Sequence, residues 1–317
     1  MRIIFFGSSH FAVPCLEALI KAKHKVVCVV TQPDKKKGRH LHIASTDVKS
    51  TAQAAQLKIF QPENIKSKES IKFLKCLDAD IFVIVAYGQI LSQEVLDIPK
   101  IMPINVHASL LPRYRGAAPI NWALINGDKK SGITIIYVTL KTDAGPVFLQ
   151  KEIEIADNDT SVSLENKLRL LGAQLLIQSL VSINNRDYRL VDQDEEKVVL
   201  APKLKKEVGL IDWNASAVDI YNQIRGVLPW PGAFTTYNKK LLKVFQAEVV
   251  KIFPNHKPEA GEVVRADKGG IIVSCGRGFL KINELQLEAG KRMPSKDFVI
   301  GHKLCLGQIL GKNSCTI

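Results

Sequence analysis

Residues 2–31 read RIIFFGSSHFAVPCLEALIKAKHKVVCVVT and combine two kinds of hydrophobic spacing. The apolar runs at 2–6 and 25–31 are typical of buried strands. Between them, Gly-Ser-Ser at 7–9 predicts a turn, and residues 10–23 carry apolar side chains at helical intervals. A strand, a helix and a second strand in this order predict parallel strands joined by a helical crossover.

The same alternation continues down the chain. It predicts a helix near 46–57, a short strand near Ile59, a helix near 68–77, and strands at 80–85 and 102–106. We therefore expect the α/β fold class, with a doubly wound, mostly parallel sheet in the N-terminal half. The first turn, GSSHFA, lacks the second glycine of a dinucleotide-binding loop, so its sequence disfavours NAD binding.

The second half of the chain has a different pattern. Alternating runs at 132–140 and 146–155 predict an antiparallel pair, and a helix is expected at 161–185. Charged, irregular sequence then predicts a linker at 189–206 between domains at 1–188 and 207–317. In the last domain we expect a capped helix that starts at Asn214 or Ser216, a rigid corner at LPWPGAF and a small OB-like β-barrel, because short strands recur between glycines at 241–250, 261–266, 270–275 and 278–285.

The composition narrows the class of protein. The chain has 317 residues, is 46% hydrophobic and carries a net charge of +13, which favours a polyanionic partner such as nucleic acid over a neutral one. The alternative explanation of this charge is that the proteins of the source organism are generally rich in lysine. No apolar run reaches the roughly 20 residues of a membrane span, so we expect a cytoplasmic protein. Six scattered cysteines without a CxxC pair predict reduced thiols and no metal site.

The most informative polar residues lie in the stretch NVHASLLPRYRG at 105–116. Asn105 and His107 are two apart on a predicted strand and therefore point to the same face. Together with the loop after Val85, they fall at the carboxyl ends of parallel strands, where such sheets bind ligands. A carboxamide beside an imidazole can bind a carbonyl oxygen or move a proton. Asp143, in the turn KTDAGP, is within reach of these strand ends, although an Asp in a turn more often bonds its own backbone.

Taken in order, several segments of this chain resemble one family. The segments are FFGSSHFAVPCLEAL, VVTQPDKKKGR, VAYGQIL, NVHASLLPRYRGAAPINWALINGD, DAGP, APKLKKEVGLIDW, RGVLPWPGAF and LQLEAGKRM. They are similar to those of the methionyl-tRNA formyltransferases and run from residue 2 to about residue 310 of this chain. The Asn-x-His-x-Ser-Leu-Leu-Pro motif with a later Asp resembles enzymes that transfer formyl from 10-formyltetrahydrofolate.

The resemblance implies a Rossmann-like N-terminal domain, an OB-like tRNA-binding C-terminal domain and formylation of initiator Met-tRNA for translation initiation. It implies catalytic roles for Asn105, His107 and Asp143, with 10-formyltetrahydrofolate as co-substrate and no metal. It further implies a monomer that contacts no membrane. The residues implied to bind folate are Ser109, Leu110, Leu111, Pro112, Ala86, Tyr87, Gly88, Gln89, Ile90 and Leu91, and those expected to bind tRNA are Lys35, Lys36, Lys37, Arg39, Lys203 and Lys206.

Other readings of the residues stay open at this point. The same trio resembles enzymes that formylate a ribonucleotide amine or a nucleotide sugar, or that hydrolyse the cofactor, but those enzymes need no basic loop or basic second domain. A non-catalytic RNA-binding protein on the same type of sheet is the alternative outside enzymes. Such a protein has no use for the trio, so alanine substitutions there would leave its RNA affinity intact.

Overall fold

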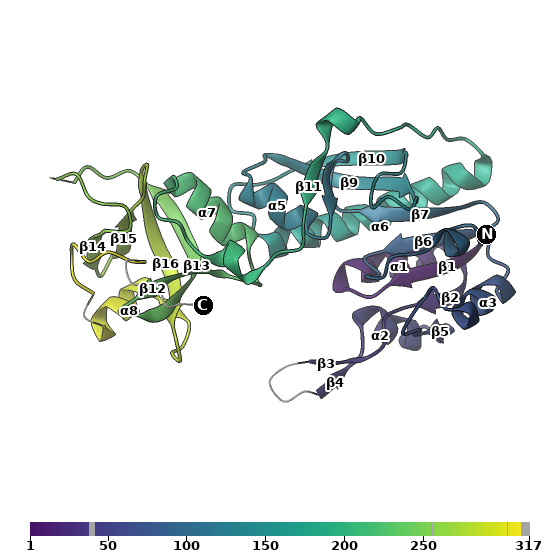
Figure 1. The fold of residues 1–317 in the computed structure, drawn as a ribbon, viewed down its shortest axis with the longest axis horizontal. Helices are drawn as coiled ribbons and strands as arrows, with labels where there is room; N and C mark the ends of the chain where they lie inside the picture. The colour runs from purple at the N-terminus through teal and green to yellow at the C-terminus, as the bar shows by residue number, and fades with distance from the viewer. Residues whose placement is uncertain (38–41, 255, 303, 312–317) are drawn as a thin grey trace. The chain divides into compact units, whose positions relative to one another are not determined.

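The computed structural model describes residues 1–37, 42–254, 256–302 and 304–311. Contacts within the chain divide it into two compact units, and most of their elements are labelled in Figure 1. The first unit consists of Met1–Pro119, Lys130–Glu154 and Glu165–Pro202. The second consists of Ile120–Lys129, Ile155–Leu164 and Lys203–Ile317.

The first unit is built on one sheet. Its strands are β1 (Arg2–Gly7), β2 (Lys25–Val30), β5 (Ile59–Phe60), β6 (Ile81–Val85), β7 (Met102–His107), β9 (Lys130–Tyr137) and β10 (Val147–Glu154). They lie in the order β10-β9-β7-β6-β1-β2-β5. The strands from β7 to β5 pair in parallel, whereas β9 and β10 are antiparallel. The predicted parallel α/β core is therefore confirmed, and its strand order reverses between β1 and β6.

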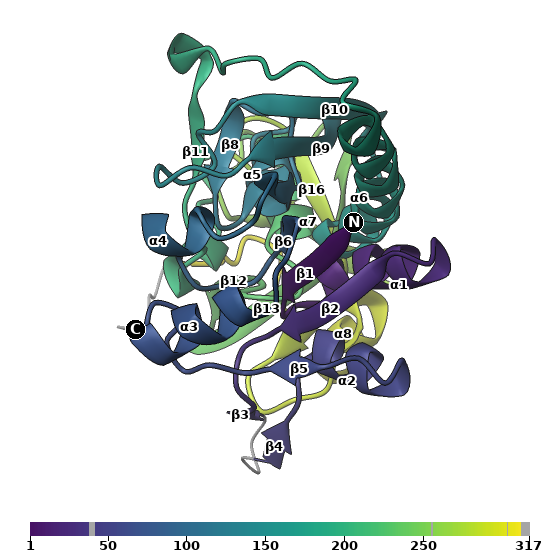
Figure 2. The same ribbon diagram turned by 90° about the vertical axis from the view of Figure 1, so that its right-hand side faces the viewer.

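Helices cover both faces of this sheet (Figure 2). They are α1 (Val13–Lys21), which follows the short 3-10 turn η1 (His10–Ala12), α2 (Asp47–Ala54), α3 (Lys68–Cys76), α4 (Gln93–Leu96) and α6 (Ser161–Asn185). The helices α3 and α4 pack with alternate side chains of β1 and β6, such as Phe6 and Phe82. On the other face, Gly172 of α6 lies against Val106 and Ile133. Ser and Thr caps fix two of the helix starts, because Thr46 and Ser67 accept backbone N–H groups of α2 and α3.

Two short ribbons, which the sequence did not predict, complete the first unit. β3 (Lys35–Lys37) pairs with β4 (His42–Ala44) in antiparallel fashion. β8 (Arg113–Gly116) pairs in parallel with β11 (Val199–Ala201), which follows the 3-10 turn η2 (Glu195–Lys197). Residues 189–202, which we predicted as part of a linker, thus make ordered contacts within the first unit.

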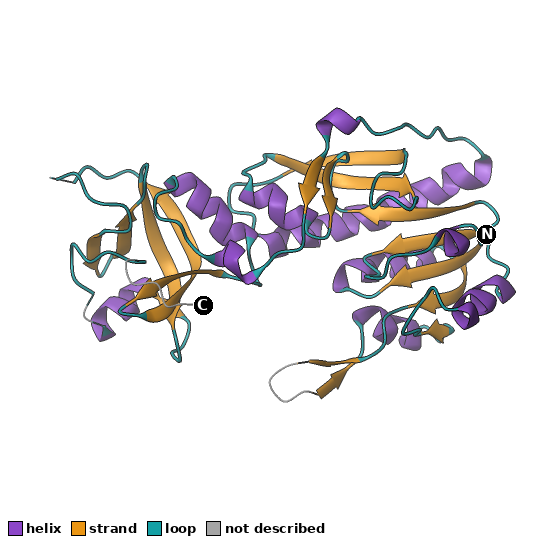
Figure 3. Cartoon of the chain, viewed as in Figure 1, coloured by secondary structure: helices purple, strands orange, loops and turns teal. Residues whose placement is uncertain are grey.

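The second unit is a β unit with flanking helices (Figure 3). Its sheet contains β12 (Ala233–Tyr237), β13 (Lys240–Val250), β14 (Val263–Asp267), β15 (Gly270–Ser274), β16 (Phe279–Leu287) and β17 (Met293–Pro294), with antiparallel pairing along the order β12-β13-β16-β15-β14. The unit also contains η3 (Lys206–Gly209), α7 (Ala217–Gly226), α8 (Ser295–Gly301) and all but the first residue of α5 (Pro119–Ile125). Ser216, one of the two predicted candidates, caps α7 by accepting the Asp219 N–H.

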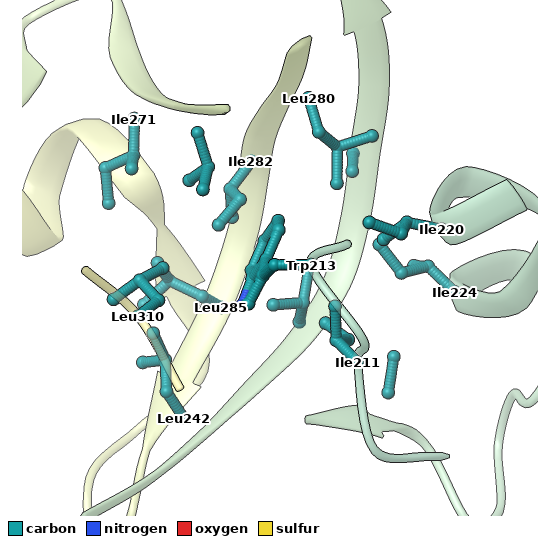
Figure 4. Packing of buried hydrophobic residues seen from close by; sticks show 14 of the residues in the cluster. Ile211, Trp213, Ile220, Ile224, Leu242, Ile271, Leu280, Ile282, Leu285 and Leu310 are labelled. Atoms are coloured by element: carbon teal, nitrogen blue, oxygen red, sulfur yellow. The ribbon is translucent and has the colours of Figure 1, made fainter. Parts of the chain in front are cut away.

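Trp213 lies among the buried apolar side chains of the second unit (Figure 4). Its indole packs in a cluster that includes Ile220 and Ile224 of α7 and Leu285 of β16. The ring Nε1–H donates to the buried Thr235 Oγ1 at 3.0 Å. Both polar atoms of this contact are thereby satisfied inside the core, as buried polar groups require.

Replacing Trp213 by Phe is expected to destabilise the second unit. The change leaves the Thr235 hydroxyl without its donor and removes part of a buried ring, which should lower the free energy of unfolding by about 1–2 kcal/mol. Urea unfolding followed by circular dichroism measures this. The variant Trp230→Phe is a matched control, because Trp230 is 55% exposed. Equal midpoints for both variants would contradict the stated role of the Trp213 contact.

Within the described ranges, no helix combines the length and the apolar character needed to cross a membrane. In the same part of the chain, His, Cys, Asp and Glu side chains form no group of three or more that could hold a metal ion. The thiols of Cys15, Cys28 and Cys275 are buried, and none of the three is part of a disulfide.

Candidate active site

Asn105 and His107 lie at the carboxyl end of β7. This strand pairs with β6 on one side and β9 on the other, which fixes the direction in which its side chains point. The two residues are on the same face of the sheet, as their spacing predicts. The His107 side chain is only 6% exposed, whereas Asn105 is half-buried.

The Asp143 carboxylate lies beside both of these side chains. It belongs to the loop between β9 and β10, and its Oδ1 is 3.6 Å from Nδ1 of His107. The Asn105 Nδ2 donates to the same Oδ1 at 3.4 Å, and the backbone N–H of Gly116 donates to Oδ2 at 3.0 Å. The structure therefore brings the three predicted catalytic residues together.

His107 uses its other ring nitrogen on the backbone. Nε2 is 2.9 Å from the carbonyl oxygen of Tyr114. A carbonyl oxygen can only accept, so Nε2 carries a proton, and Nδ1 is the ring atom that faces Asp143. This matters for the chemistry, because an imidazole that binds a carbonyl oxygen of a substrate needs a free N–H donor. In this geometry the Nε2–H is already occupied by Tyr114.

The predicted folate segment at 109–112 follows directly after β7. The Ser109 hydroxyl donates to the Arg113 carbonyl at 2.7 Å, so its side chain serves the local turn. The Leu111 backbone is held on both sides, because its N–H donates to Thr134 Oγ1 and its carbonyl accepts from Gln150. Leu110 and Pro112 are half-buried and are the side chains of this segment that a ligand could reach.

The predicted folate-binding loop at 86–91 lies at the point where the strand order of the sheet reverses. The Tyr87 carbonyl accepts from Ser8 Oγ, which ties the loop after β6 to the turn after β1. Crevices at such reversal points bind ligands in open α/β sheets. The Tyr87 ring and Leu91 are buried, and Tyr87 packs edge-on against Phe6. Gln89 bonds the backbone of Ile65, and the exposed members of the loop are Ala86, Gly88 and Ile90.

The lysines predicted to bind tRNA fall in separate parts of the chain. Lys35 donates to Gln32 Oε1 at 2.7 Å in the first unit. Lys203 and Lys206 are exposed residues of the second unit. Arg39 and the side chains of Lys36 and Lys37 lie outside what the structure describes.

Sequence reasoning missed three residues around the trio, which are Tyr114, Gly116 and Gln193. The Gly116 N–H and the Tyr114 carbonyl are backbone groups of β8. Residue type does not predict their role, because nearly every residue carries the same backbone groups. Gln193 donates to the carbonyls of Asp143 and Gly145, but it lies in a charged stretch that carries no motif. Only the position of Tyr114 and Gly116 in the RYRG segment, directly after the predicted folate segment, offered a signal.

Comparison with known proteins covers both units. Residues 1–180 match the model of the formyl transferase family, and residues 203–303 match that of the formyl transferase C-terminal domain. The methionyl-tRNA formyltransferase of Acetivibrio thermocellus is 43% identical over 312 residues, which is 98% of this chain and 100% of that protein. That of Citrifermentans bemidjiense is 43% identical over 317 residues, covering 100% of this chain and 98% of the other.

Solved structures with the same fold include the sugar 3N-formyl transferase WlaRD in the presence of dTDP and 5-N-formyl-THF. It aligns with a TM-score of 0.65 at 19% identity, over 89% of this chain and 97% of that one. HypX from Aquifex aeolicus, in complex with tetrahydrofolic acid, aligns with a TM-score of 0.61 at 15% identity, over 94% of this chain and 47% of the other. With both family models matched and these full-length relatives, the chain belongs to the methionyl-tRNA formyltransferase family.

Proposed function

We propose that this protein transfers the formyl group of 10-formyltetrahydrofolate to the α-amino group of methionine on initiator tRNA. The observation that carries the proposal is the apposition of Asn105, His107 and Asp143 at the edge of the sheet where its parallel strands end. The relatives that match both units act on methionyl-tRNA according to their names. The reaction as proposed uses the folate as co-substrate and no metal.

The reaction forms a bond between the methionine nitrogen and the formyl carbon, and it breaks the bond from that carbon to N10 of the folate. The amine attacks only when it is neutral, and with an α-amino pKa of roughly 7.7–8.0 about a tenth or more is neutral near pH 7. The amine proton must leave as the new bond forms, and N10 leaves with a proton as tetrahydrofolate. A base beside the amine and a donor beside the formyl oxygen are therefore needed.

We assign removal of the amine proton to His107, with the Asp143 carboxylate as its partner. With Nε2–H held by the Tyr114 carbonyl, Nδ1 of a neutral ring has its lone pair available and can take the amine proton. The Asp143 carboxylate, 3.6 Å away, then stabilises the positive charge on the imidazole. The Gly116 N–H holds this carboxylate from its other oxygen.

Asn105 is the proposed donor to the tetrahedral oxyanion. One N–H of its carboxamide bonds Asp143, which leaves the second N–H for the formyl oxygen. A donor that is already oriented gives more stabilisation in the transition state than mobile water does. The folate would lie along the sheet edge between loop 86–91 and segment 109–112, where Ala86, Gly88, Ile90, Leu110 and Pro112 are accessible.

We further propose that the second unit is an OB-like barrel that binds tRNA, with domain boundaries at 1–188 and 207–317. Support comes from its short antiparallel strands and from the net charge of +13. Lys203 and Lys206 are assigned to phosphate contacts, and Lys35, Lys36, Lys37 and Arg39 to the acceptor end. A cytoplasmic monomer is part of the same proposal.

The experiment that tests this function compares acceptors for a labelled formyl group. The protein is supplied with 10-formyltetrahydrofolate and either initiator Met-tRNA, elongator Met-tRNA or a nucleotide-linked amino sugar. We expect transfer to initiator Met-tRNA, with elongator Met-tRNA a poor acceptor. Transfer to the sugar amine alone, or hydrolysis of the cofactor without an acceptor, would contradict the proposal.

Removing one phosphate-binding lysine is expected to weaken tRNA binding and flatten its salt dependence. For Lys203→Ala and Lys206→Ala, the slope of log K against log salt should become less steep by about 0.7–0.9 per lysine, because one fewer counterion is released. Filter binding at several salt concentrations measures the slope. Lys75→Ala is the control, since Lys75 lies on α3 and pairs with Glu94. A slope unchanged from the parent in both test variants would remove these lysines from the interface.

A further inference from the structure

Residues 191–201 run past the loop that carries Asp143. At one end, Val191 forms an antiparallel bridge with Val147, the first residue of β10. At the other end, β11 pairs with β8, the strand that contributes the Tyr114 carbonyl and the Gly116 N–H to the site. Gln193 and Glu195 lie between these two anchors, so their backbone positions are fixed from both sides.

The Gln193 side chain makes three hydrogen bonds, two to this loop and one to Arg115. Its Nε2 donates to the carbonyl of Asp143 at 2.8 Å and to the carbonyl of Gly145 at 2.7 Å. Its Oε1 accepts from Arg115 Nε at 3.0 Å. The amide thus binds the backbone on both sides of residue 144, directly behind the carboxylate that faces His107.

Arg115 and Glu195 hold the amide in place. The Arg115 side chain is buried, and its Nη2 donates to Glu195 Oε1 at 2.8 Å. The second oxygen of Glu195 accepts from Lys141, the first residue of the KTDAG loop, at 2.8 Å. Hydrogen bonds from Arg115 and Lys141 lower the pKa of Glu195 to about 2. The carboxylate is therefore charged at every pH near or above the usual pKa of a glutamate.

The loop has a physical need for such support. Asp143 has a backbone φ of +51°, in the left-handed region, which costs free energy for residues other than glycine although aspartate tolerates it better than most. The loop is closed at its base by the bond from the Tyr137 N–H to the Pro146 carbonyl. Above that bond, the carbonyls of Asp143 and Gly145 point to Gln193.

We propose that Gln193 is a positioning residue for formyl transfer, and that its side-chain amide sets the position of the Asp143 carboxylate beside His107. The inference rests on the proposed function of the trio and extends it to a residue that touches none of the reacting atoms. It assigns a role in the chemistry to a stretch of chain whose sequence resembles a linker.

Two variants separate the role of the Gln193 N–H groups from that of its side-chain oxygen. Gln193→Leu removes both, while Gln193→Glu keeps an oxygen for Arg115 and loses the N–H groups that hold the loop. Two neutral hydrogen bonds of ordinary strength correspond to a kcat lower by about 10- to 30-fold in each variant. The KM values for 10-formyltetrahydrofolate and for initiator Met-tRNA should stay at the parental values. Parental kcat in Gln193→Glu would overturn the role of the N–H groups.

Gln223→Leu is the matched control. Gln223 Nε2 also donates to two backbone carbonyls, those of Val208 and Leu210 in the second unit, both at 2.8 Å. The control removes the same kind of contact, so it should lower thermal stability by a similar amount and leave kcat unchanged. If Gln193→Leu lowers only stability, as the control does, Gln193 is structural and the inference fails.

A second comparison isolates the link to Asp143. In an Asp143→Asn background, Gln193→Leu should lower kcat no further, because the group that it positions has already lost its charge. A full additional loss would show that Gln193 acts independently of Asp143 and would overturn the inference. Formylation of Met-tRNA by the parent enzyme is measured in the same series, so failure of the proposed function is seen separately from failure at Gln193.

Discussion

Replacing Asp143 by Asn is expected to lower the rate of formyl transfer by about 100- to 1,000-fold, the usual cost of removing one preorganised electrostatic partner. The substitution keeps the size of the side chain and an oxygen that can accept from Gly116, but it removes the charge beside Nδ1 of His107. The imidazole then loses the partner that stabilises its protonated form during proton removal from the amine. Binding of both substrates should change little, so the loss should be in kcat.

The measurement is single-turnover formylation of initiator Met-tRNA at saturating 10-formyltetrahydrofolate. Asp97→Asn serves as the control, because Asp97 is an exposed residue at the end of α4 whose carboxylate bonds only Gln93 among the contacts described. We expect parental rates for this control. A rate for Asp143→Asn within about threefold of the parent, well below the cost expected for a lost partner, would mean that the carboxylate has no part in the reaction.

Gly145→Ala is expected to abolish most of the activity through the backbone. A Cβ atom built at Gly145 would lie 1.8 Å from the Tyr137 carbonyl oxygen, which belongs to a strand and cannot move aside cheaply. The loop must therefore shift away from β9, and the Asp143 carboxylate shifts with it. We expect a loss of at least about 100-fold in formylation, comparable to losing the carboxylate, together with about 1–3 kcal/mol of stability from the steric conflict.

Gly301→Ala is the comparison for this variant, because among the described residues, apart from its chain neighbours and its own helix backbone, no atom lies within 4 Å of the Cβ position at Gly301. Thermal unfolding and formylation are measured for both proteins. The control should keep parental activity and stability. Parental activity in Gly145→Ala would show that the loop between β9 and β10 can move without consequence, and that the position of Asp143 is not critical.

Some of the fold could be predicted because local patterns and long-range packing agree there. The helix at 161–185 and the strand that carries Asn105 and His107 follow from uninterrupted hydrophobic spacing, and the structure has them as α6 and β7. The approach of Asp143 to His107 was also predictable, since the turn after β9 lies at the edge where β7 ends.

Other elements depend on tertiary contacts that no local pattern records. The LPWPGAF segment was predicted as a corner, yet its last residues begin β12, which pairs with β13. The stretch with Gln193 has no hydrophobic period, because its role depends on two carbonyls of a distant loop and on the buried Arg115. The Tyr87 ring is buried against Phe6, a contact between the loop after β6 and strand β1 that no local pattern indicates.

The central claim is that Asn105 and Asp143 act as parts of one site on one reaction step. A double-mutant cycle of Asn105→Ala and Asp143→Asn, followed by single-turnover formylation of initiator Met-tRNA, tests it most directly. Each single change should slow transfer by about 100- to 1,000-fold, and the double variant should be slower than the slower single by less than about tenfold, because residues that act as a unit are strongly non-additive. Near-parental transfer in both single variants, or a double loss equal to the product of the two, would contradict the claim.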